Sequence, residues 1–432
     1  MKNLVNLRHL QTYGCRKLSY MPRGLGELAA LHSLDRFVVA DKSNVARHAG
    51  GLSELGSLNN LGAELSIENL GHGKNAALEL KAANLKDKQH LQSLVLFWRH
   101  GCEGDQTSVV ENDEMSLDDL QPHSNMKALK VVNFMGLRFA SWLSTLNNLV
   151  KFELMSCEKC QHLPDLHELP FLKELTLYAL ISLEYISDCD SSDQFSPSSS
   201  TPTTPFFPSL TTLKIRFCLN LKGWWRQRTS TNGNNGALGL TTTTTSTLPQ
   251  SQPLFPSLHD LEIKNCPLLT SMPLFPDLRS LELMDTSFRP LQQTIMTRNA
   301  SIVVSTSTST STSTLPHTSS PLSKLKNLSI SQIKDVNSLP EEIGNLTSLQ
   351  SLDIIECPNL TSLPEVIGNL SMLQSLKVWE CPNLEFLPEG MRLLTSLKLL
   401  KIDNCPTLSR RCKRDIGEDW PKIAHILKSE TD

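Results

Sequence analysis

Apolar residues return at a fixed interval through the last quarter of the chain. Segments that begin at Leu346, Leu370 and Leu394 read LTSLQSLDIIECPNLTSLPEVIGN, LSMLQSLKVWECPNLEFLPEGMRL and LTSLKLLKIDNCPTL. An earlier segment, LSKLKNLSISQIKDVNSLPEEIGN from Leu322, keeps the same frame, so each copy starts 24 residues after the one before it. A fixed period of this length indicates a repeated structural unit that stacks on its neighbours.

Within one repeat, apolar and polar positions alternate. In LDIIEC, Leu352 and Ile354 alternate with Asp353 and Ile355, which predicts a short strand with one buried face. A Pro-Asn turn follows, and the rest of the repeat returns on the opposite side. The pattern LxxLxxLxLxxC therefore predicts an α/β leucine-rich-repeat solenoid. We expect a curved horseshoe with parallel strands on its concave face and an irregular or short helical convex side.

Less regular copies of the same strand extend back to the start of the chain. Together with the four regular copies they give 14 candidate strands, whose predicted inward-facing pairs are Leu10-Thr12, Phe37-Val39, Leu65-Ile67, Leu94-Leu96, Val132-Phe134, Phe152-Leu154, Leu175-Leu177, Leu213-Ile215, Leu261-Ile263, Leu281-Leu283, Leu328-Ile330, Leu352-Ile354, Leu376-Val378 and Leu400-Ile402. The solenoid is predicted to span residues 1–427. Residues 409–427 form its C-terminal cap, with Trp420, Ile423 and Ile426 over the last strand.

Four segments interrupt the repeats. Residues 188–206, 228–253 and 305–320 are rich in Ser, Thr, Pro or Asn. Such segments bury too little apolar surface to offset the loss of chain entropy on folding. Residues 103–119 carry seven acidic residues and no Lys or Arg. We expect all four to be disordered or loop inserts outside the solenoid.

Charge and hydropathy narrow the class of partner. The formal net charge is −3, which gives no case for nucleic acid or an anionic membrane as the main partner. The chain has no run of 18 apolar residues, and its first residues, MKNLVNLRHL, are already in repeat register, with no signal peptide. These features favour a cytoplasmic protein with reduced thiols.

The sequence lacks a catalytic or metal-binding constellation. Cys157 and Cys160 form a lone CxxC, and no second pair lies at a matching distance. No phosphate-binding GxxxxGK[ST], HExxH or GxSxG motif is present. Seven cysteines instead occupy one slot after the inward strand residues, where a small thiol packs in the core: Cys15, Cys157, Cys218, Cys266, Cys357, Cys381 and Cys405. We therefore expect no enzymatic activity, no cofactor and no metal.

The residue just beyond each inward pair is predicted to lie on the concave face. Read along the chain, this set is Tyr13, Phe97, Met135, Met155, Tyr178, Arg216, Lys264, Met284, Ser331, Ile355, Trp379 and Asp403. Aromatic residues, Met and Arg are enriched at protein interfaces. The set is therefore predicted to form a protein-binding surface. The alternative is that inserted loops or a partner domain cover it.

Both ends of the chain resemble one protein family. The opening NLVNLRHLQTYGCRKLSYMPRGLGELAALHSLDRFVVADK, the passage LGSLNNLGAELSIENL and the close RRCKRDIGEDWPKIAHI are similar to the repeat region of plant nucleotide-binding leucine-rich-repeat disease resistance proteins of the coiled-coil class. The matching positions include Cys15, Met21-Pro22, Phe37-Val38-Val39, Cys412 and Trp420. The coiled coil and nucleotide-binding domain of that family have no counterpart in this sequence.

The resemblance implies a recognition function in plant defence. Members of that family use their repeats to recognise a pathogen effector or a guarded host protein, or to restrain the nucleotide-binding switch domain. Three alternatives remain: a generic cytosolic repeat scaffold, a substrate adaptor of a ubiquitin ligase, and an extracellular repeat receptor, whose repeats usually carry a GxIP turn in place of SLPEEIGN.

Overall fold

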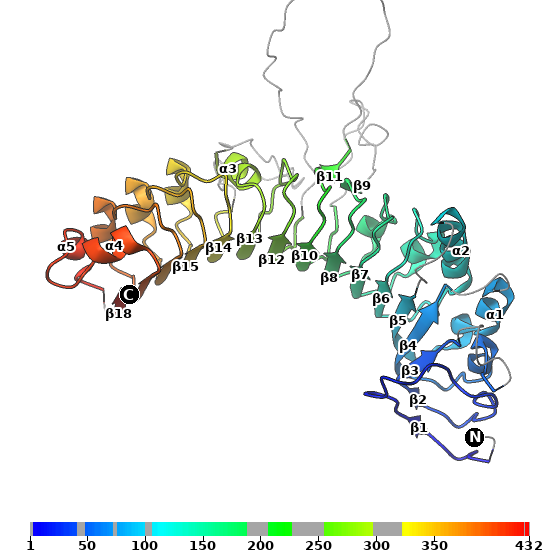
Figure 1. The fold of residues 1–432 in the computed structure, drawn as a ribbon. Coiled ribbons are helices and arrows are strands. Elements are labelled where there is room, and N and C mark those ends of the chain that lie inside the picture. Colours follow the sequence, from blue (N-terminus) through cyan, green and yellow to red (C-terminus); the bar gives the residue numbers. More distant parts are fainter. Residues whose placement is uncertain are drawn as a thin grey trace, which may run out of the picture.

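Fourteen parallel strands of the described chain form one sheet that curves into an open arc (Figure 1). The structure, a computed structural model, describes residues 3–40, 48–71, 76–99, 106–187, 206–226, 255–296, 322–426 and 428–431. The strands follow each other across the sheet in chain order: β3 (Arg36–Val38), β4 (Ala63–Leu70), β5 (Leu91–Trp98), β6 (Ala128–Val132), β7 (Lys151–Met155), β8 (Glu174–Tyr178), β10 (Thr212–Arg216), β12 (Asp260–Lys264), β13 (Ser280–Met284), β14 (Asn327–Ser331), β15 (Ser351–Ile355), β16 (Ser375–Trp379), β17 (Leu399–Asp403) and β18 (Lys428–Thr431). This is the predicted leucine-rich-repeat solenoid.

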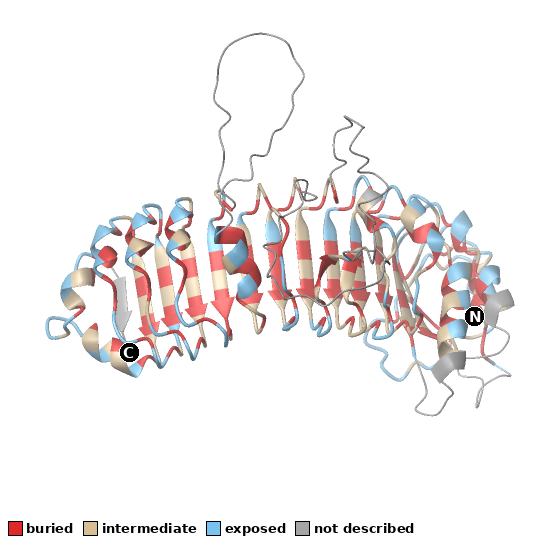
Figure 2. Cartoon of the chain, turned by 90° about the horizontal axis from the view of Figure 1, so that it is seen from above, coloured by how far each residue is buried: buried red, intermediate tan, exposed pale blue. Residues whose placement is uncertain are grey.

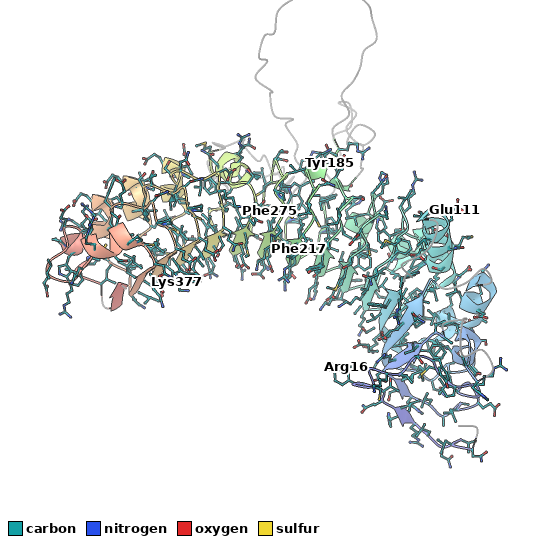
Figure 3. The ribbon with its side chains drawn as sticks, viewed as in Figure 1. Arg16, Glu111, Tyr185, Phe217, Phe275 and Lys377 are labelled. Carbon is teal, nitrogen blue, oxygen red and sulfur yellow. The ribbon has the colours of Figure 1, made fainter. Side chains whose placement is uncertain are left out.

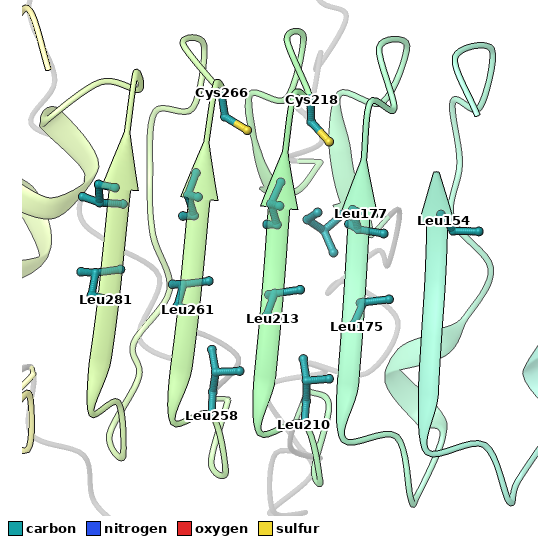
Figure 4. Packing of buried hydrophobic residues seen from close by; sticks show 14 of the residues in the cluster. Leu154, Leu175, Leu177, Leu210, Leu213, Cys218, Leu258, Leu261, Cys266 and Leu281 are labelled. Atoms are coloured by element: carbon teal, nitrogen blue, oxygen red, sulfur yellow. The ribbon is translucent and has the colours of Figure 1, made fainter. Parts of the chain in front are cut away.

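Stacked leucines hold the strands in register. Leu328 pairs with Leu352, which pairs with Leu376, and this pairs with Leu400, so one inward position forms a continuous column. All four side chains are at most 1% exposed. Figure 4 shows the same stacking between β7 and β13, and Figure 2 shows buried bands that run across the strands. Each repeat thus completes the core of its neighbour, which is why one repeat would not fold alone.

The predicted inward pairs differ from the structure in β3, in β6 and at the N-terminus. In β3, Phe37 pairs with Ile67 and so takes the second inward position, and Val39 lies beyond the strand. In β6 the inward pair is Leu129 and Val131, because these residues pair with Phe152 and Leu154 of β7. Val132 faces outward, and Phe134 lies beyond the strand as a buried residue. At the N-terminus, β1 (His9–Leu10) pairs with β2 (Ser33–Leu34) in a separate two-stranded sheet. That first predicted strand therefore lies outside the main sheet.

Short helices cover the outer side of the arc (Figure 1). In the last repeats they are 3-10 turns, η5 (Glu341–Asn345), η6 (Glu365–Asn369) and η7 (Glu389–Leu393). Each begins directly after a proline whose ψ is 150–158°. The proline ring fixes φ at the residue that leads into the turn. The remaining described elements of this side are η1 (Leu52–Leu55), α1 (Ala76–Ala82), η2 (Leu85–Asp87), η3 (Ser141–Thr145), η4 (Leu166–Glu168), α3 (Arg289–Met296) and the short pair β9 (Tyr185–Ser187) and β11 (Gly223–Trp225).

The described part of the acidic segment, residues 106–119, is not a solvated loop. Residues Gln106–Asp119 form the helix α2, and two tryptophans, one in β5 and one in η3, donate hydrogen bonds to it. Trp98 Nε1 donates to Ser116 Oγ at 3.0 Å, and Trp142 Nε1 donates to the Leu117 carbonyl at 3.0 Å. Leu117 is fully buried. The acidic residues belong to a packed part of the solenoid, and the prediction of an insert is wrong here.

The other three predicted inserts lie outside the described residues, apart from Phe206. That residue joins a buried aromatic cluster on the outer side with Phe207, Trp224, Phe255 and Phe275, whose ring centroids are 4.8–5.7 Å apart along the chain of contacts. Aromatic rings at this spacing stabilise beyond the area that they bury. The cluster seals the core between the repeats of β10 and β12.

Buried thiols form part of the core. Cys357 Sγ donates to the carbonyls of Ile355 at 3.5 Å and Ile330 at 3.8 Å, and the equivalent contacts recur at Cys381 and Cys405. Burial raises the pKa of the Cys157 thiol to about 12, so this thiol stays protonated. Cys15 is exposed in the turn after β1 and does not share the buried slot.

The C-terminal segment covers the end of the array. Helices α4 (Pro406–Arg411) and α5 (Trp420–Ile423) follow β17, and β18 then pairs with β17. Ile423 and Ile426 are buried, and Trp420 packs against the core. The three apolar residues are packed as expected, but α5 contacts η7 on the outer side, and the strand beside β17 is β18.

Candidate functional site: the concave face of the sheet

From β6 to β17 the last residue of each strand of the main sheet points out of its inner face, and Phe97, the residue before the last in β5, holds the same register position. We call this set the wall column: Phe97, Val132, Met155, Tyr178, Arg216, Lys264, Met284, Ser331, Ile355, Trp379 and Asp403. Each member is the register partner of the next. Parallel strands lie about 4.8 Å apart, so the column is a continuous row of closely spaced side chains.

Ten of the twelve residues proposed from sequence as a protein-binding face lie in this row: Phe97, Met155, Tyr178, Arg216, Lys264, Met284, Ser331, Ile355, Trp379 and Asp403. Met135 does not, because the phase error in β6 places Val132 in the row. Tyr13 lies in the turn after β1, outside the main sheet, and is 95% exposed. Binding by these ten residues stays a prediction.

Large apolar side chains are accessible in the wall column. Trp379 is 38% exposed, and Met155, Tyr178 and Ile355 are partly exposed. The indole of Trp379 lies between Ile355 and Asp403 in the register of neighbouring strands. Exposed aromatic and apolar residues in one row are typical of surfaces that bind proteins.

Charged residues in the middle of the wall are held in an ion-pair network. Arg216 donates through Nε and Nη2 to Glu262, with both distances 2.6 Å. Lys264 Nζ contacts Glu262 and Glu282, each at 2.8 Å. Burial alone would raise the pKa of Glu262, but the bonds from Arg216 and Lys264 lower it overall. Paired in this way, these long side chains have fixed positions on the face.

A second row follows the wall column along one edge of the sheet. We call it the rim: Asn133, Ser156, Ala179, Phe217, Asn265, Asp285, Gln332, Glu356, Glu380 and Asn404. Every rim residue has a left-handed φ between 44° and 58°. From Asn133 to Glu380, each rim amide donates to the wall-column carbonyl of the following strand at 2.8–3.1 Å. The rim backbone is therefore as regular as the strands.

Sequence reasoning did not identify the rim. The signal was present, because in the regular repeats the residue before the cysteine slot is always polar, as at Glu356, Glu380 and Asn404. Asparagine and other residues with short polar side chains tolerate the left-handed region better than bulky ones. This preference would have marked the position as the turn that ends each strand.

The rim encloses a groove at the C-terminal end of the array. The groove has a volume of about 640 Å³ and is lined by Asp285, Gln332, Lys334, Glu356, Pro358, Glu380, Pro382 and Asn404. Gln332 Nε2 donates to Glu356 Oε2 at 2.8 Å. In the described chain, neither Glu356 nor Glu380 forms an ion pair. This part of the face therefore presents uncompensated negative charge beside Trp379.

The described residues hold no set of three His, Cys, Asp or Glu side chains able to bind a metal ion. In the same residues, no helix has the length and apolar character that a membrane span requires. The concave face is thus a large, regular surface of apolar and charged side chains.

Comparisons with known proteins relate the repeats to plant proteins. The family described as R13L1/DRL21 LRRs matches residues 52–180, and a leucine-rich repeat region family matches residues 278–418. The chain is 33% identical over 264 residues to the disease resistance protein RGA4 of Solanum bulbocastanum, a match that covers 60% of this chain and 23% of that protein. It is 31% identical over 233 residues to the disease resistance RPP13-like protein 1 of Arabidopsis thaliana, covering 51% and 19%.

The chain thus spans less than a quarter of the length of these relatives. Among solved structures, a leucine-rich-repeat protein of Leptospira interrogans is similar at 17% identity with a TM-score of 0.40, over 99% of this chain and 96% of that one.

Proposed function

Because this chain is a leucine-rich-repeat protein related through its repeats to plant disease resistance proteins, we propose that it is a non-enzymatic recognition module of plant immunity. Its partner is a protein: a pathogen effector, a guarded host protein, or a nucleotide-binding switch domain that it restrains. It needs no cofactor, and it acts in the cytoplasm. The alternatives are a generic cytosolic repeat scaffold and a substrate adaptor of a ubiquitin ligase, with an extracellular receptor less favoured.

The main support for this proposal is the wall column. Side chains there are spaced by the sheet itself, so their positions are set before a partner arrives, and little conformational entropy is lost on binding. Trp379 and Ile355 give this surface adjacent apolar groups, and tryptophan is among the residues that most often dominate binding energy. A rigid row of this kind suits recognition of a folded protein surface.

Proximity labelling in plant leaves tests the proposal. The full chain is fused to a labelling enzyme and compared with a wall variant, Ile355→Ser/Trp379→Ser. The matched control is Met372→Ser/Leu393→Ser, which removes two apolar side chains that are 48% and 64% exposed and lie outside the strands. We expect the wall variant to lose a defined set of labelled proteins that the control retains.

The identity of those proteins separates the alternatives. Effectors, host targets of effectors or nucleotide-binding resistance proteins agree with the proposal, whereas subunits of a ubiquitin ligase favour an adaptor. Labelling that is the same for all three chains would show that the wall column binds nothing, and the proposal would then be wrong.

A further inference from the structure

Phe217 breaks the pattern of the rim. The other nine rim residues are Asn, Ser, Ala, Asp, Gln or Glu, whereas Phe217 places a benzyl group on a backbone with φ of 58°. A bulky residue in the left-handed region is a strained outlier. The described chain has two comparable cases, Phe207 and Leu322, and both are almost fully buried. Their strain is offset by core packing, but Phe217 is 40% exposed.

The surroundings of Phe217 are also apolar and accessible. Its ring lies 5.2 Å from that of Tyr178 in the preceding strand, with the planes tilted by 60°. Leu219 and Leu268 follow the ends of β10 and β12 and are 44% and 47% exposed. Figure 3 places Phe217 on the inner side of the arc, on the same side as Lys377. We call Tyr178, Phe217, Leu219 and Leu268 the rim patch.

One cation beside the patch has no ion-pair partner among the described residues. Lys214 lies two positions before Arg216 in β10 and is aligned with Glu262 in β12. The Glu262 carboxylate, however, is already bonded to Arg216 and Lys264. The network therefore leaves Lys214 as a positive charge within reach of a ligand that covers Phe217.

We propose that the rim patch is the contact centre for the protein partner, and that it takes a segment with an aliphatic or aromatic side chain and a carboxylate within about two residues of it. The apolar side chain packs against Phe217 and Tyr178, and the carboxylate pairs with Lys214. This inference rests on the proposed recognition function and names the chemistry of its partner. Strain at an exposed residue is expected where the residue serves binding and not stability.

A stability measurement tests the strain. Phe217→Asn installs the residue that Asn133, Asn265 and Asn404 show to fit the rim, so we expect the urea midpoint of unfolding to rise. The reverse change one strand along, Asn265→Phe, should lower it. If Phe217→Asn lowers the midpoint, the side chain is structural and the inference is wrong.

A binding measurement tests the chemistry. Twelve-residue peptides are selected from a random phage library on the immobilised full chain, then synthesised and titrated by fluorescence anisotropy. We expect them to combine an apolar with an acidic residue and to bind Phe217→Asn and Tyr178→Ala at least tenfold more weakly. Lys214→Ala should weaken them by a smaller factor. The control is Phe171→Asn, because Phe171 is 56% exposed but precedes β8 at the other end of the strand.

The outcomes distinguish this inference from the proposed function. Peptides that keep their affinity for Phe217→Asn but lose it for Ile355→Ser/Trp379→Ser overturn the inference and leave the wall column as the binding face. Peptides affected by neither change count against both. A library that yields no apolar and acidic binder also overturns the inference.

Discussion

Leu376 and Lys377 are neighbours in β16 with opposite surroundings. Leu376 is fully buried, whereas Lys377 lies on the concave face with its Nζ 3.2 Å from Asp353. Leu376→Ala should therefore cost about 2–5 kcal/mol of unfolding free energy through the cavity that it leaves, and Leu376→Asp should cost more because it buries a charge. Lys377→Ala should cost less than about 1 kcal/mol, as a partly exposed ion pair does. Urea unfolding of the three variants measures this, and equal losses for Leu376→Ala and Lys377→Ala would contradict the strand phase.

Lys88 makes stability depend on pH. Its side chain is fully buried, and Nζ donates to the carbonyls of Leu55 at 2.6 Å and Leu58 at 3.2 Å. Burial lowers the pKa of Lys88 to about 8, against the opposing effect of Asp87. Between that value and the pKa near 10.5 of an unfolded chain, the unfolded state binds more protons. The unfolding free energy should therefore rise with pH across this window and fall as pH drops through 8.

Urea unfolding at pH 7.5 and pH 9.5 checks the effect. Lys88→Met should remove this rise, which we expect to be roughly 1–3 kcal/mol. Lys86→Met, at an exposed position on the same turn, should leave it unchanged. A rise of the same size in both variants would assign the effect to other groups.

Most of the strand phase could be predicted from residue type, and its failure at β6 has a local cause. Val132, Asn133 and Phe134 alternate as a strand would, but Asn133 has φ of 57° and ends the strand. Phe134 then occupies the buried slot that cysteine fills elsewhere. The four last repeats were predictable because their 24-residue period fixes the frame, whereas the spacing around β6 is irregular.

At the scale of elements, the helix α2 is held by tertiary contacts that its amino-acid composition does not indicate. Val110 and Leu117 lie at helical spacing within the acidic segment, yet the bonds that hold α2 come from Trp98 and Trp142, 18 and 25 residues away from the groups that accept them. A polar segment that is fixed by distant partners resembles a solvated loop in sequence. Tertiary contacts of this kind are the part of the fold that local patterns do not report.

One acidic residue of α2 should hold a neighbouring loop. Glu114 Oε1 accepts the amides of Leu137 at 2.8 Å and Arg138 at 3.1 Å. Glu114→Ala leaves both amides without this acceptor, at a cost of about 1–3 kcal/mol. We expect their hydrogen exchange to accelerate by roughly tenfold or more, since about 1.4 kcal/mol corresponds to a factor of ten.

Glu111 offers the matched control on the same helix, because its side chain is exposed on the outer side of the arc (Figure 3). Glu111→Ala should leave both exchange rates unchanged. Equal acceleration in the two variants would mean that net charge, and not the hydrogen bonds to the loop, controls this region.

For the whole molecule, stability depends on how the last repeat is closed. Asp419 is fully buried and accepts the Leu387 amide at 3.0 Å and Arg411 Nε at 3.0 Å, and Lys422 Nζ lies 2.9 Å from it. Burial alone would raise the pKa of Asp419, but the bonds from Arg411, Lys422 and Leu387 lower it overall. Its contribution is present above the unfolded pKa near 3.8 and is lost as pH falls through the lower folded value.

Removal of this carboxylate should open the C-terminal end first. Asp419→Ala removes the buried partner of Arg411 and Lys422, which keep only carboxylates that are more exposed, and should cost about 3–5 kcal/mol. We expect faster amide exchange in residues 387–426 and little change around β7. Glu418→Ala is the control, because the Glu418 carboxylate is mostly exposed. If Asp419→Ala instead speeds amide exchange equally in all repeats, the array unfolds as one unit.

The regular rim backbone also bears on how such a surface can diversify. Its hydrogen bonds join main-chain amides to main-chain carbonyls from Asn133 to Glu380, so they do not depend on which side chain a rim residue carries. A change of rim residue alters the shape and charge offered to a partner while the register of the array is kept. New binding specificities can therefore arise by substitution at single rim positions, with paired substitutions expected where rim side chains bond to each other, as Gln332 does to Glu356.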